Sequence, residues 1–123
     1  MITLEEYLQD NDTSPFKRWF STLDAQAAFK VSNALMRLEL GNTSNIKWFD
    51  GLGEYRINWG PGYRVYLTQE GKRLIILFGG GDKSTQKKDI KQAKMLVAEF
   101  RARKKAERNI CLLYTSPSPR DRG

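Results

Sequence analysis

The feature that most constrains the fold is the stretch YRINWGPGYRVYLTQEGKRLIILFGGGDKSTQKKDI, residues 55–90, which holds strand-like runs separated by glycine-containing breaks. The runs are residues 54–59, 63–69 and 72–78. GPG at 60–62 separates the first two, and EG at 70–71 suits a two-residue hairpin turn before the third. The third run contains LIILF, which suits a buried central strand, and the glycines at 79–81 are expected to end it. This stretch predicts three consecutive antiparallel strands.

One candidate strand and two helical segments precede these three strands. The candidate strand is residues 2–8. Ser14-Pro15 then predicts a helix start, with Ser at the cap and Pro at the first helical position. A second helical segment begins at about Asp24 and ends at Gly41, a usual C-terminal stop. The two segments form either a helical hairpin or one bent helix.

A last helix follows the third strand. Ser84-Thr85-Gln86 is expected to cap it, and its apolar stripe continues to about Arg103. The fold class predicted from these elements is α+β: an antiparallel sheet packed against an N-terminal helical hairpin, with a C-terminal helix.

Side chains alternate between the two faces of a strand, so the register of the hairpins decides which residues become neighbours. Symmetric closure pairs Trp59 with Tyr63, and Leu67 with Leu74. One face is then core, with Tyr55, Ile57, Trp59, Val65, Leu67, Leu74 and Ile76. The other face carries Glu54, Arg56, Asn58, Arg64 and Tyr66.

Positive charge is concentrated in the second half of the chain. Residues 1–50 hold 5 Lys/Arg and 7 Asp/Glu, whereas residues 51–110 hold 14 and 6. A basic half suits an anionic partner such as RNA, DNA, an acidic protein or anionic lipid; the alternative is a solvated basic surface. Arg56 and Arg64 side by side without acids nearby would repel each other, which indicates an anion site. The alternative is that both decorate a solvated face, paired with Glu54 or with acids of the helices.

The C-terminal segment changes character. CLLYTSPSPRDRG, from Cys111 to Gly123, has no periodicity and two Ser-Pro steps. CLLYTSPSPRD is similar to the translation of a sequencing adapter. We expect a domain over residues 1–105 and a disordered tail over 106–123, with 111–123 an adapter read-through and the natural chain ending soon after Lys105. The alternative is a genuine disordered tail.

Other segments bear on the cellular compartment. The start, MITLEEYLQD, lacks the features of a secretory signal, and no apolar run approaches the roughly 20 residues that cross a bilayer. A single cysteine provides neither a disulfide framework nor a multi-cysteine metal site. These observations predict a cytoplasmic protein without a membrane partner.

The blocks RINWGPGYRVYL and LIILFGGGDKSTQKKDIKQA, with helices placed before the strands, resemble the RelE/ParE superfamily of bacterial toxins. The nearest branch is the HigB-like group called addiction module killer proteins, which is related to a phage protein family. The resemblance covers residues 1–105. It implies the toxin of a type II toxin–antitoxin system, neutralised by a cognate helix-turn-helix antitoxin. It also implies an mRNA endoribonuclease (an mRNA interferase), acting free or on the ribosome, with no metal and no cofactor.

The resemblance assigns roles to individual residues. In such ribonucleases the RNA 2′-OH attacks the adjacent phosphate, and the enzyme stabilises the charge that develops. Arg64, in GYR, is implied to clamp the scissile phosphate. Lys83, in GGDK, is implied to stabilise charge or to protonate the leaving 5′-oxygen. Arg56 is a third cationic contact, and Tyr66 orients the 2′-OH or stacks on a base. The implied RNA-binding residues are Arg56, Arg64, Lys83, Tyr63 and Lys87.

The sequence departs from the toxins that it resembles at positions that transfer protons. RelE-type toxins carry a tyrosine in the last helical region, where this chain has Ile90, and HigB-type members often use a histidine, which this chain lacks. Two alternatives therefore stay open: a gyrase-inhibiting ParE-like toxin, and a catalytically inactive relative that binds an antitoxin or DNA. Retention of Arg64 and Lys83 favours the nuclease.

Overall fold

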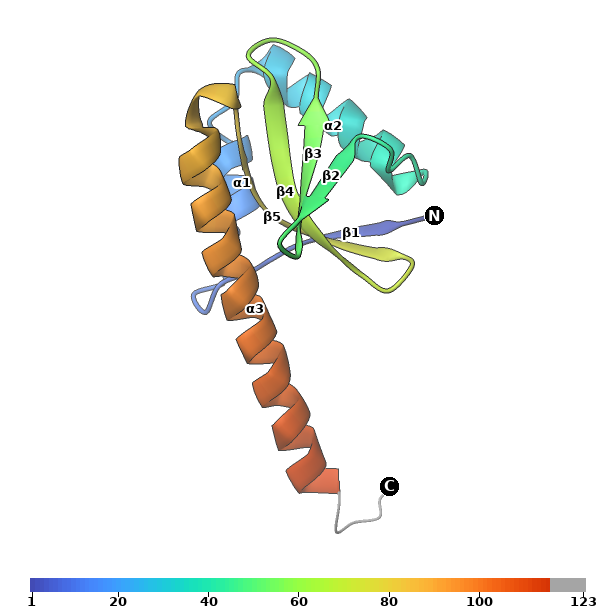
Figure 1. The fold of residues 1–123 in the computed structure, drawn as a ribbon, viewed down its shortest axis with the longest axis vertical. Helices are drawn as coiled ribbons and strands as arrows, with labels where there is room; N and C mark the ends of the chain where they lie inside the picture. The colour runs from blue at the N-terminus through green and yellow to red at the C-terminus, as the bar shows by residue number, and fades with distance from the viewer. Residues whose placement is uncertain (116–123) are drawn as a thin grey trace.

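The computed structural model describes the backbone of residues 1–115 as an α+β domain built on one five-stranded sheet (Figure 1). The strand order is β1-β5-β4-β3-β2. The strands are β1 (Thr3–Glu6), β2 (Ile46–Phe49), β3 (Leu52–Ile57), β4 (Tyr63–Glu70) and β5 (Leu74–Gly81). The apolar run LIILF lies in β5, which has neighbours on both sides, as expected for a central strand.

The sheet is mixed, whereas the sequence predicted an antiparallel one. The pairs β2–β3, β3–β4 and β4–β5 are antiparallel, but β1 lies parallel to β5. Helices α1 and α2 and strands β2 to β4 intervene between β1 and its partner, so no hairpin forces the two to run in opposite directions. β1 was recognised in the sequence, but its direction was not.

The first two helices begin where the sequence predicted. Helix α1 (Pro15–Phe20) has Ser14 as its N-cap, and helix α2 (Ala25–Glu39) has Asp24, whose carboxylate accepts a hydrogen bond from the Ala27 amide at 2.8 Å. After α2 the chain turns at Gly41, which has φ 97°. Both helices follow β1, as the candidate strand at residues 2–8 predicted, so the helical pair precedes strands β2 to β5 but does not open the chain.

Helix α3 (Gln86–Thr115) begins after a single 3₁₀ turn, Lys83–Thr85. Asp82 caps this 3₁₀ turn, because its carboxylate accepts the Ser84 amide at 2.8 Å. Of the predicted cap residues, Ser84 and Thr85 lie inside the turn and Gln86 is the first residue of α3. The helix continues past its expected end near Arg103, and it extends beyond the sheet in Figure 1. Residues 116–123 lie outside the described residues, and the adapter origin of 111–123 stays a prediction.

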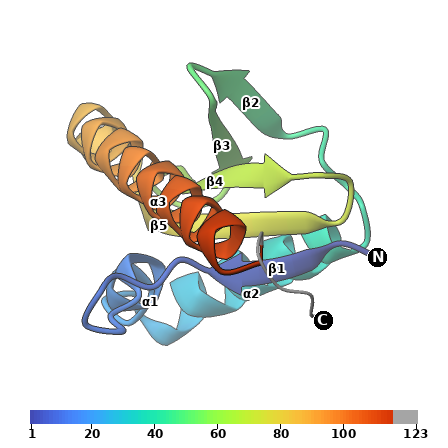
Figure 2. The same cartoon turned by 90° about the horizontal axis from the view of Figure 1, so that it is seen from below.

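The sheet is covered on both faces. Viewed from below, α1 and α2 lie on one side of the sheet and α3 lies on the other (Figure 2). One core lies against α1 and α2, and it includes Phe16, Val31, Leu38, Val65, Leu67, Ile75 and Leu77. The second core lies against α3, and it includes Leu52, Tyr66, Ile76, Phe78, Leu96 and Val97. The sheet face that was predicted to be polar is therefore largely buried.

Both hairpins close with longer loops than predicted. In the first, Ile57 pairs with Tyr63 and Arg56 with Arg64, a shift of two residues that leaves the faces unchanged. In the second, Leu67 pairs with Leu77 instead of Leu74, because Glu70 pairs with Leu74 and the turn consists of residues 71–73 instead of the predicted 70–71. This odd shift moves Leu74 and Ile76 to the α3 face and brings Ile75 and Leu77 to the other core.

The three glycines at 79–81 do not end the strand, because β5 continues to Gly81. Two of them allow close approach of neighbouring side chains. A Cβ on Gly80 would overlap the Trp19 ring, and a Cβ on Gly81 would overlap the Asp89 carboxylate. The glycines therefore let α1 and α3 pack tightly against the end of β5.

Candidate functional site

A buried carboxylate holds two arginines at the end of the β3–β4 hairpin. Glu54 on β3 is 1% exposed. Its Oε1 accepts a hydrogen bond from Arg56 Nε at 3.3 Å, and its Oε2 lies 3.4 Å from Arg64 Nε. The register explains the contact, since Arg56 is paired with Arg64 and Glu54 is two residues along the same strand. We call Glu54, Arg56, Arg64, Tyr66 and Gln86 the Glu54 cluster.

Two further donors complete the shell of the Glu54 carboxylate. The Tyr66 hydroxyl donates to Oε2 at 3.3 Å, and Gln86 Nε2, from the first residue of α3, donates to the same oxygen at 2.8 Å. Burial, together with the negative charge of Glu54, raises the pKa of Tyr66 far above its ordinary value. Tyr66 therefore stays a neutral donor, and Glu54 has four partners from three elements.

The cluster holds two arginines against one acid, so a positive charge remains. The Arg64 side chain is 11% exposed, and its Nη1 donates to the Gly62 carbonyl at 3.0 Å. The Arg56 side chain is 45% exposed, and only its Nε is engaged by Glu54. The outer edge of the Arg56 guanidinium can thus donate a pair of hydrogen bonds to an anion that arrives from solvent.

The structure places Lys83 beside this cluster. A Cβ on Gly62, where φ is 79°, would lie 3.7 Å from Arg64 Nη1 and 3.8 Å from Lys83 Cβ. Asp82, the cap of the 3₁₀ turn, precedes this lysine. The pKa of Asp82 is lowered, first by the Ser84 hydroxyl and in smaller part by the charge of Arg64. The 3₁₀ turn before α3 therefore brings a third, exposed cation close to Arg64.

Two of the predicted RNA-binding residues lie apart from the cluster. Tyr63 belongs to the opposite face of the sheet. There its ring stacks on that of Trp59, with 6.1 Å between the ring centroids, and it forms an edge contact with Trp19, with 6.2 Å between the centroids. Lys87 is exposed on the first turn of α3, where it lines a shallow pocket together with Lys83. The pattern thus predicted Arg56, Arg64 and Lys83 as one site, but it did not separate Tyr63 from them.

Tyr66 does not have the exposure that its predicted role requires. Its ring is 0% exposed and packs in the α3 core, so it cannot stack on a base. Its hydroxyl is directed to Glu54. Tyr66 acts in this site by holding the carboxylate, and through it the arginines.

The sequence did not single out Glu54 as the central residue. The two arginines were expected to lack an acid nearby, and Glu54 was weighed only as their partner on a solvated face. The structure shows the pairing with Glu54, but it buries this acid instead of leaving it on a solvated face. The signal was present, because Glu54 and Arg56 are two residues apart on one strand and so share a face. Gln86 carried no comparable signal, since only the packing of α3 brings it to β3.

Other kinds of site receive less support from the described residues. Among the side chains that the structure describes, those of residues 1–107, no three of His, Cys, Asp or Glu are grouped so that they could hold a metal ion. No helix in the described part of the chain is both long enough and apolar enough to cross a membrane. The Glu54 cluster with Lys83 is the arrangement from which a function can be argued.

Comparison with known proteins places the chain in a family. No family model matches the sequence. The chain is 48% identical over 95 residues to an uncharacterized protein of Haemophilus influenzae, an alignment that covers 76% of this chain and 96% of that protein. The chain therefore belongs to the same family as the Haemophilus influenzae protein.

Proposed function

We propose that the chain is a RelE/ParE-type toxin of a type II toxin–antitoxin system, and that it cleaves mRNA without a metal ion. The observation that carries the proposal is the Glu54 cluster: a buried carboxylate fixes two arginines, and Lys83 lies beside them. Resemblance of the GPGYRVY and GGDKSTQ blocks to HigB-like toxins supports the same conclusion. The cytoplasm is the compartment in which such a toxin meets mRNA.

The geometry of the arginines supports phosphate binding. Nε of Arg56 and Nε of Arg64 both face Glu54, so the terminal nitrogens of each guanidinium lie farther from the carboxylate. A scissile phosphate bridged by these nitrogens would receive charge-assisted hydrogen bonds from groups that already have their orientation. Glu54 is a positioning residue in this scheme, because it is buried and already accepts from several donors.

The reaction proceeds by attack of the RNA 2′-OH on the neighbouring phosphorus. The bond from phosphorus to the 5′-oxygen of the next nucleotide breaks, leaving a 2′,3′-cyclic phosphate and a free 5′-OH. The 2′-OH proton goes to water, and Lys83 donates the proton that the leaving 5′-oxygen takes up. Arg56 and Arg64 stabilise the additional negative charge of the transition state.

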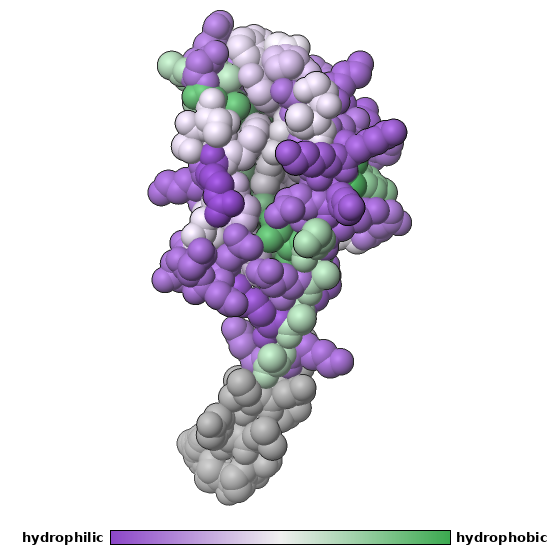
Figure 3. All heavy atoms as spheres, turned by 90° about the vertical axis from the view of Figure 1, so that its left-hand side faces the viewer, coloured by the Kyte–Doolittle hydropathy of each residue, from purple (hydrophilic) through white to green (hydrophobic). Residues whose placement is uncertain are grey.

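The partner that neutralises such a toxin is a helix-turn-helix antitoxin with an acidic segment. The molecular surface on the α3 side is largely hydrophilic (Figure 3), and the exposed lysines of α3 include Lys87, Lys88, Lys91 and Lys94. An acidic segment laid on this surface would be attracted by charge, so its affinity should fall as salt rises.

The experiment that tests the proposal is to map mRNA 5′ ends while the full chain is expressed under tight control, with Arg64→Ala alongside. We expect new 5′ ends as growth stops, and their loss in the variant. Growth arrest without new ends, accompanied by an SOS response, would overturn the proposal in favour of a gyrase inhibitor. Absence of arrest with a folded chain would favour an inactive binding relative.

A further inference from the structure

Beside the Glu54 cluster lies a polar pocket that the proposed reaction does not use. It has a volume of about 310 Å³ and lies between the start of β2 and the end of β3. Its lining residues are Ser44, Asn45, Ile46, Lys47, Arg56 and Asn58. We propose that this pocket binds one nucleobase of the RNA, next to the phosphate held by Arg56, and so sets the base preference of cleavage. This inference rests on the proposed function and adds a specificity site to it.

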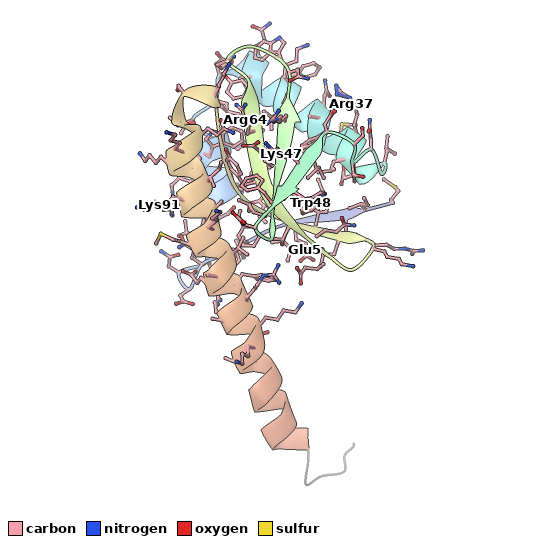
Figure 4. The ribbon with its side chains drawn as sticks, in the orientation of Figure 1. Glu5, Arg37, Lys47, Trp48, Arg64 and Lys91 are labelled. Atoms are coloured by element: carbon pink, nitrogen blue, oxygen red, sulfur yellow. The ribbon has the colours of Figure 1, made fainter. Side chains whose placement is uncertain are left out.

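The pairing of β2 with β3 assembles the pocket. Ile46 pairs with Tyr55 and Lys47 with Glu54, which places Lys47 on the same sheet face as the carboxylate. One residue before β2, the Asn45 carbonyl accepts a hydrogen bond from the Arg56 amide at 3.3 Å. In Figure 4, Lys47 comes from β2 and Arg64 from β4, on opposite sides of β3. The pocket therefore adjoins the cluster across Arg56.

Arg56 belongs to both sites. Its Nε is held by Glu54 Oε1, while almost half of its side chain is exposed and lines the pocket. Neighbouring phosphate and base belong to one nucleotide, so a phosphate at the outer edge of this guanidinium brings a base to the pocket. The flat guanidinium can also stack on the face of that base.

The remaining side chains suit the edge of a base. Asn45 and Asn58 are exposed, and neither side-chain amide makes a hydrogen bond to another residue in the described part of the chain. Each amide offers one acceptor and two donors, the combination that pairs with the mixed donor and acceptor edge of a base. Lys47 adds a cation at the rim, where it can contact a neighbouring phosphate.

The size of the pocket fits a single nucleotide. Small-molecule sites span roughly 300–1,000 Å³, so this one lies at the lower end. The pocket combines cations with neutral amides, whereas a site for phosphate alone would require only the cations. The arrangement therefore favours a nucleotide over a free phosphate as the ligand.

The test uses nucleoside monophosphates and NMR, and it does not require cleavage. The ¹⁵N-labelled full chain is titrated with AMP, CMP, GMP and UMP, and ribose 5-phosphate serves as the control without a base. We expect amide shifts at residues 45–47 and 58 with at least one nucleotide, and much smaller shifts with ribose 5-phosphate. Asn58→Ala should weaken the binding of that nucleotide at least about fivefold, because a contact to the edge of the base is lost. Gln26→Ala, a change at an exposed position of α2, should leave the affinity for that nucleotide unchanged.

The outcomes separate this inference from the proposed function. Equal shifts with ribose 5-phosphate, or none with any nucleotide, would overturn the base site even if the chain cuts mRNA. Selective shifts would support the base site even if no cleavage is found. If the chain cuts mRNA, Asn58→Ala should in addition change the base found at the mapped cleavage sites, and an unchanged preference would contradict the inference.

Discussion

Two charged clusters join α3 to the sheet, and each places one acid between two cations. In the Glu54 cluster the acid is 1% exposed and Arg64 is 11% exposed. In the second, which we call the Glu70 cluster, the carboxylate of Glu70 on β4 meets Lys104 at 2.8 Å and Arg101 at 3.9 Å. There the cations are about half exposed.

The difference between the clusters is in burial and in the elements that hold the cations. The arginines of the Glu54 cluster come from paired strands, and the carboxylate also binds Tyr66 and Gln86. The cations of the Glu70 cluster, Arg101 and Lys104, are long side chains on the surface of one helix. A pocket of about 370 Å³ adjoins the Glu70 cluster too, so a pocket alone does not mark the functional site. Fixed cations do, because they bind an anion without first losing side-chain entropy.

The largest expected difference is in stability. Glu54→Gln leaves Arg64 buried without its counter-charge, and breaking such a pair costs about 3–5 kcal/mol of unfolding free energy. Glu70→Gln removes a pairing between exposed cations and a partly exposed acid, which should cost about 1 kcal/mol or less. Urea unfolding of both variants measures the difference. Equal losses would mean that the two clusters do not differ in kind.

The next effect is on catalysis. Lys83→Ala should lower the rate of RNA cleavage about 100-fold, because the leaving 5′-oxygen loses its proton donor. Lys104→Ala, which removes another exposed lysine, from the Glu70 cluster, should leave the rate within about twofold. Single-turnover cleavage of a labelled RNA measures both. If the two variants slow the reaction to the same extent, Lys83 has no special role.

A smaller effect concerns alkaline pH. The pKa of Tyr66 is raised from 10.0, first by burial, so the folded protein keeps the phenol proton after the unfolded chain has lost it. Stability from this tyrosine is therefore present below pH 10 and is lost as pH rises above it. Tyr66→Phe should lower the free energy of unfolding by about 1 kcal/mol at neutral pH. It should also reduce the amount by which this free energy falls at alkaline pH.

Tyr7 provides the matched comparison for Tyr66. Its pKa is also raised, first by burial and then by its hydrogen bond to Glu99, but Arg103 acts in the opposite direction. Tyr7→Phe should therefore flatten the alkaline loss less than Tyr66→Phe does. Unfolding free energies measured from pH 8 to 11 give both slopes, and a larger effect at Tyr7 would refute this ranking.

Local signals in the sequence predicted much of the fold. Ser14 and Asp24 accept from the first helical amides, so the helix starts could be read from a few neighbouring residues. The direction of β1 and the register of β5 could not be predicted in this way, because both depend on contacts between distant segments. One extra residue in the turn after Glu70 was enough to exchange the faces of Leu74 and Ile76.

The site was predictable to a similar degree. The spacing of Arg56 and Arg64 around the GPG turn placed them on one face, and the structure brings them together. That α3 buries this face was not visible in the sequence, and it turns Tyr66 from a surface residue into a support for Glu54. The pocket proposed to bind a base was also missed, because it depends on the pairing of β2 with β3.

The central claim is that the Glu54 cluster binds an RNA phosphate, whereas the Glu70 cluster is structural. The most direct measurement is the affinity of a short 2′-O-methyl RNA, which lacks the attacking hydroxyl, for the wild type, Arg64→Ala and Arg101→Ala over a range of salt concentrations. We predict that Arg64→Ala weakens binding at least about tenfold and lowers the salt slope by about 1, with circular dichroism confirming the fold. Arg101→Ala should bind as the wild type does. Equal affinities for the two folded variants would contradict the account.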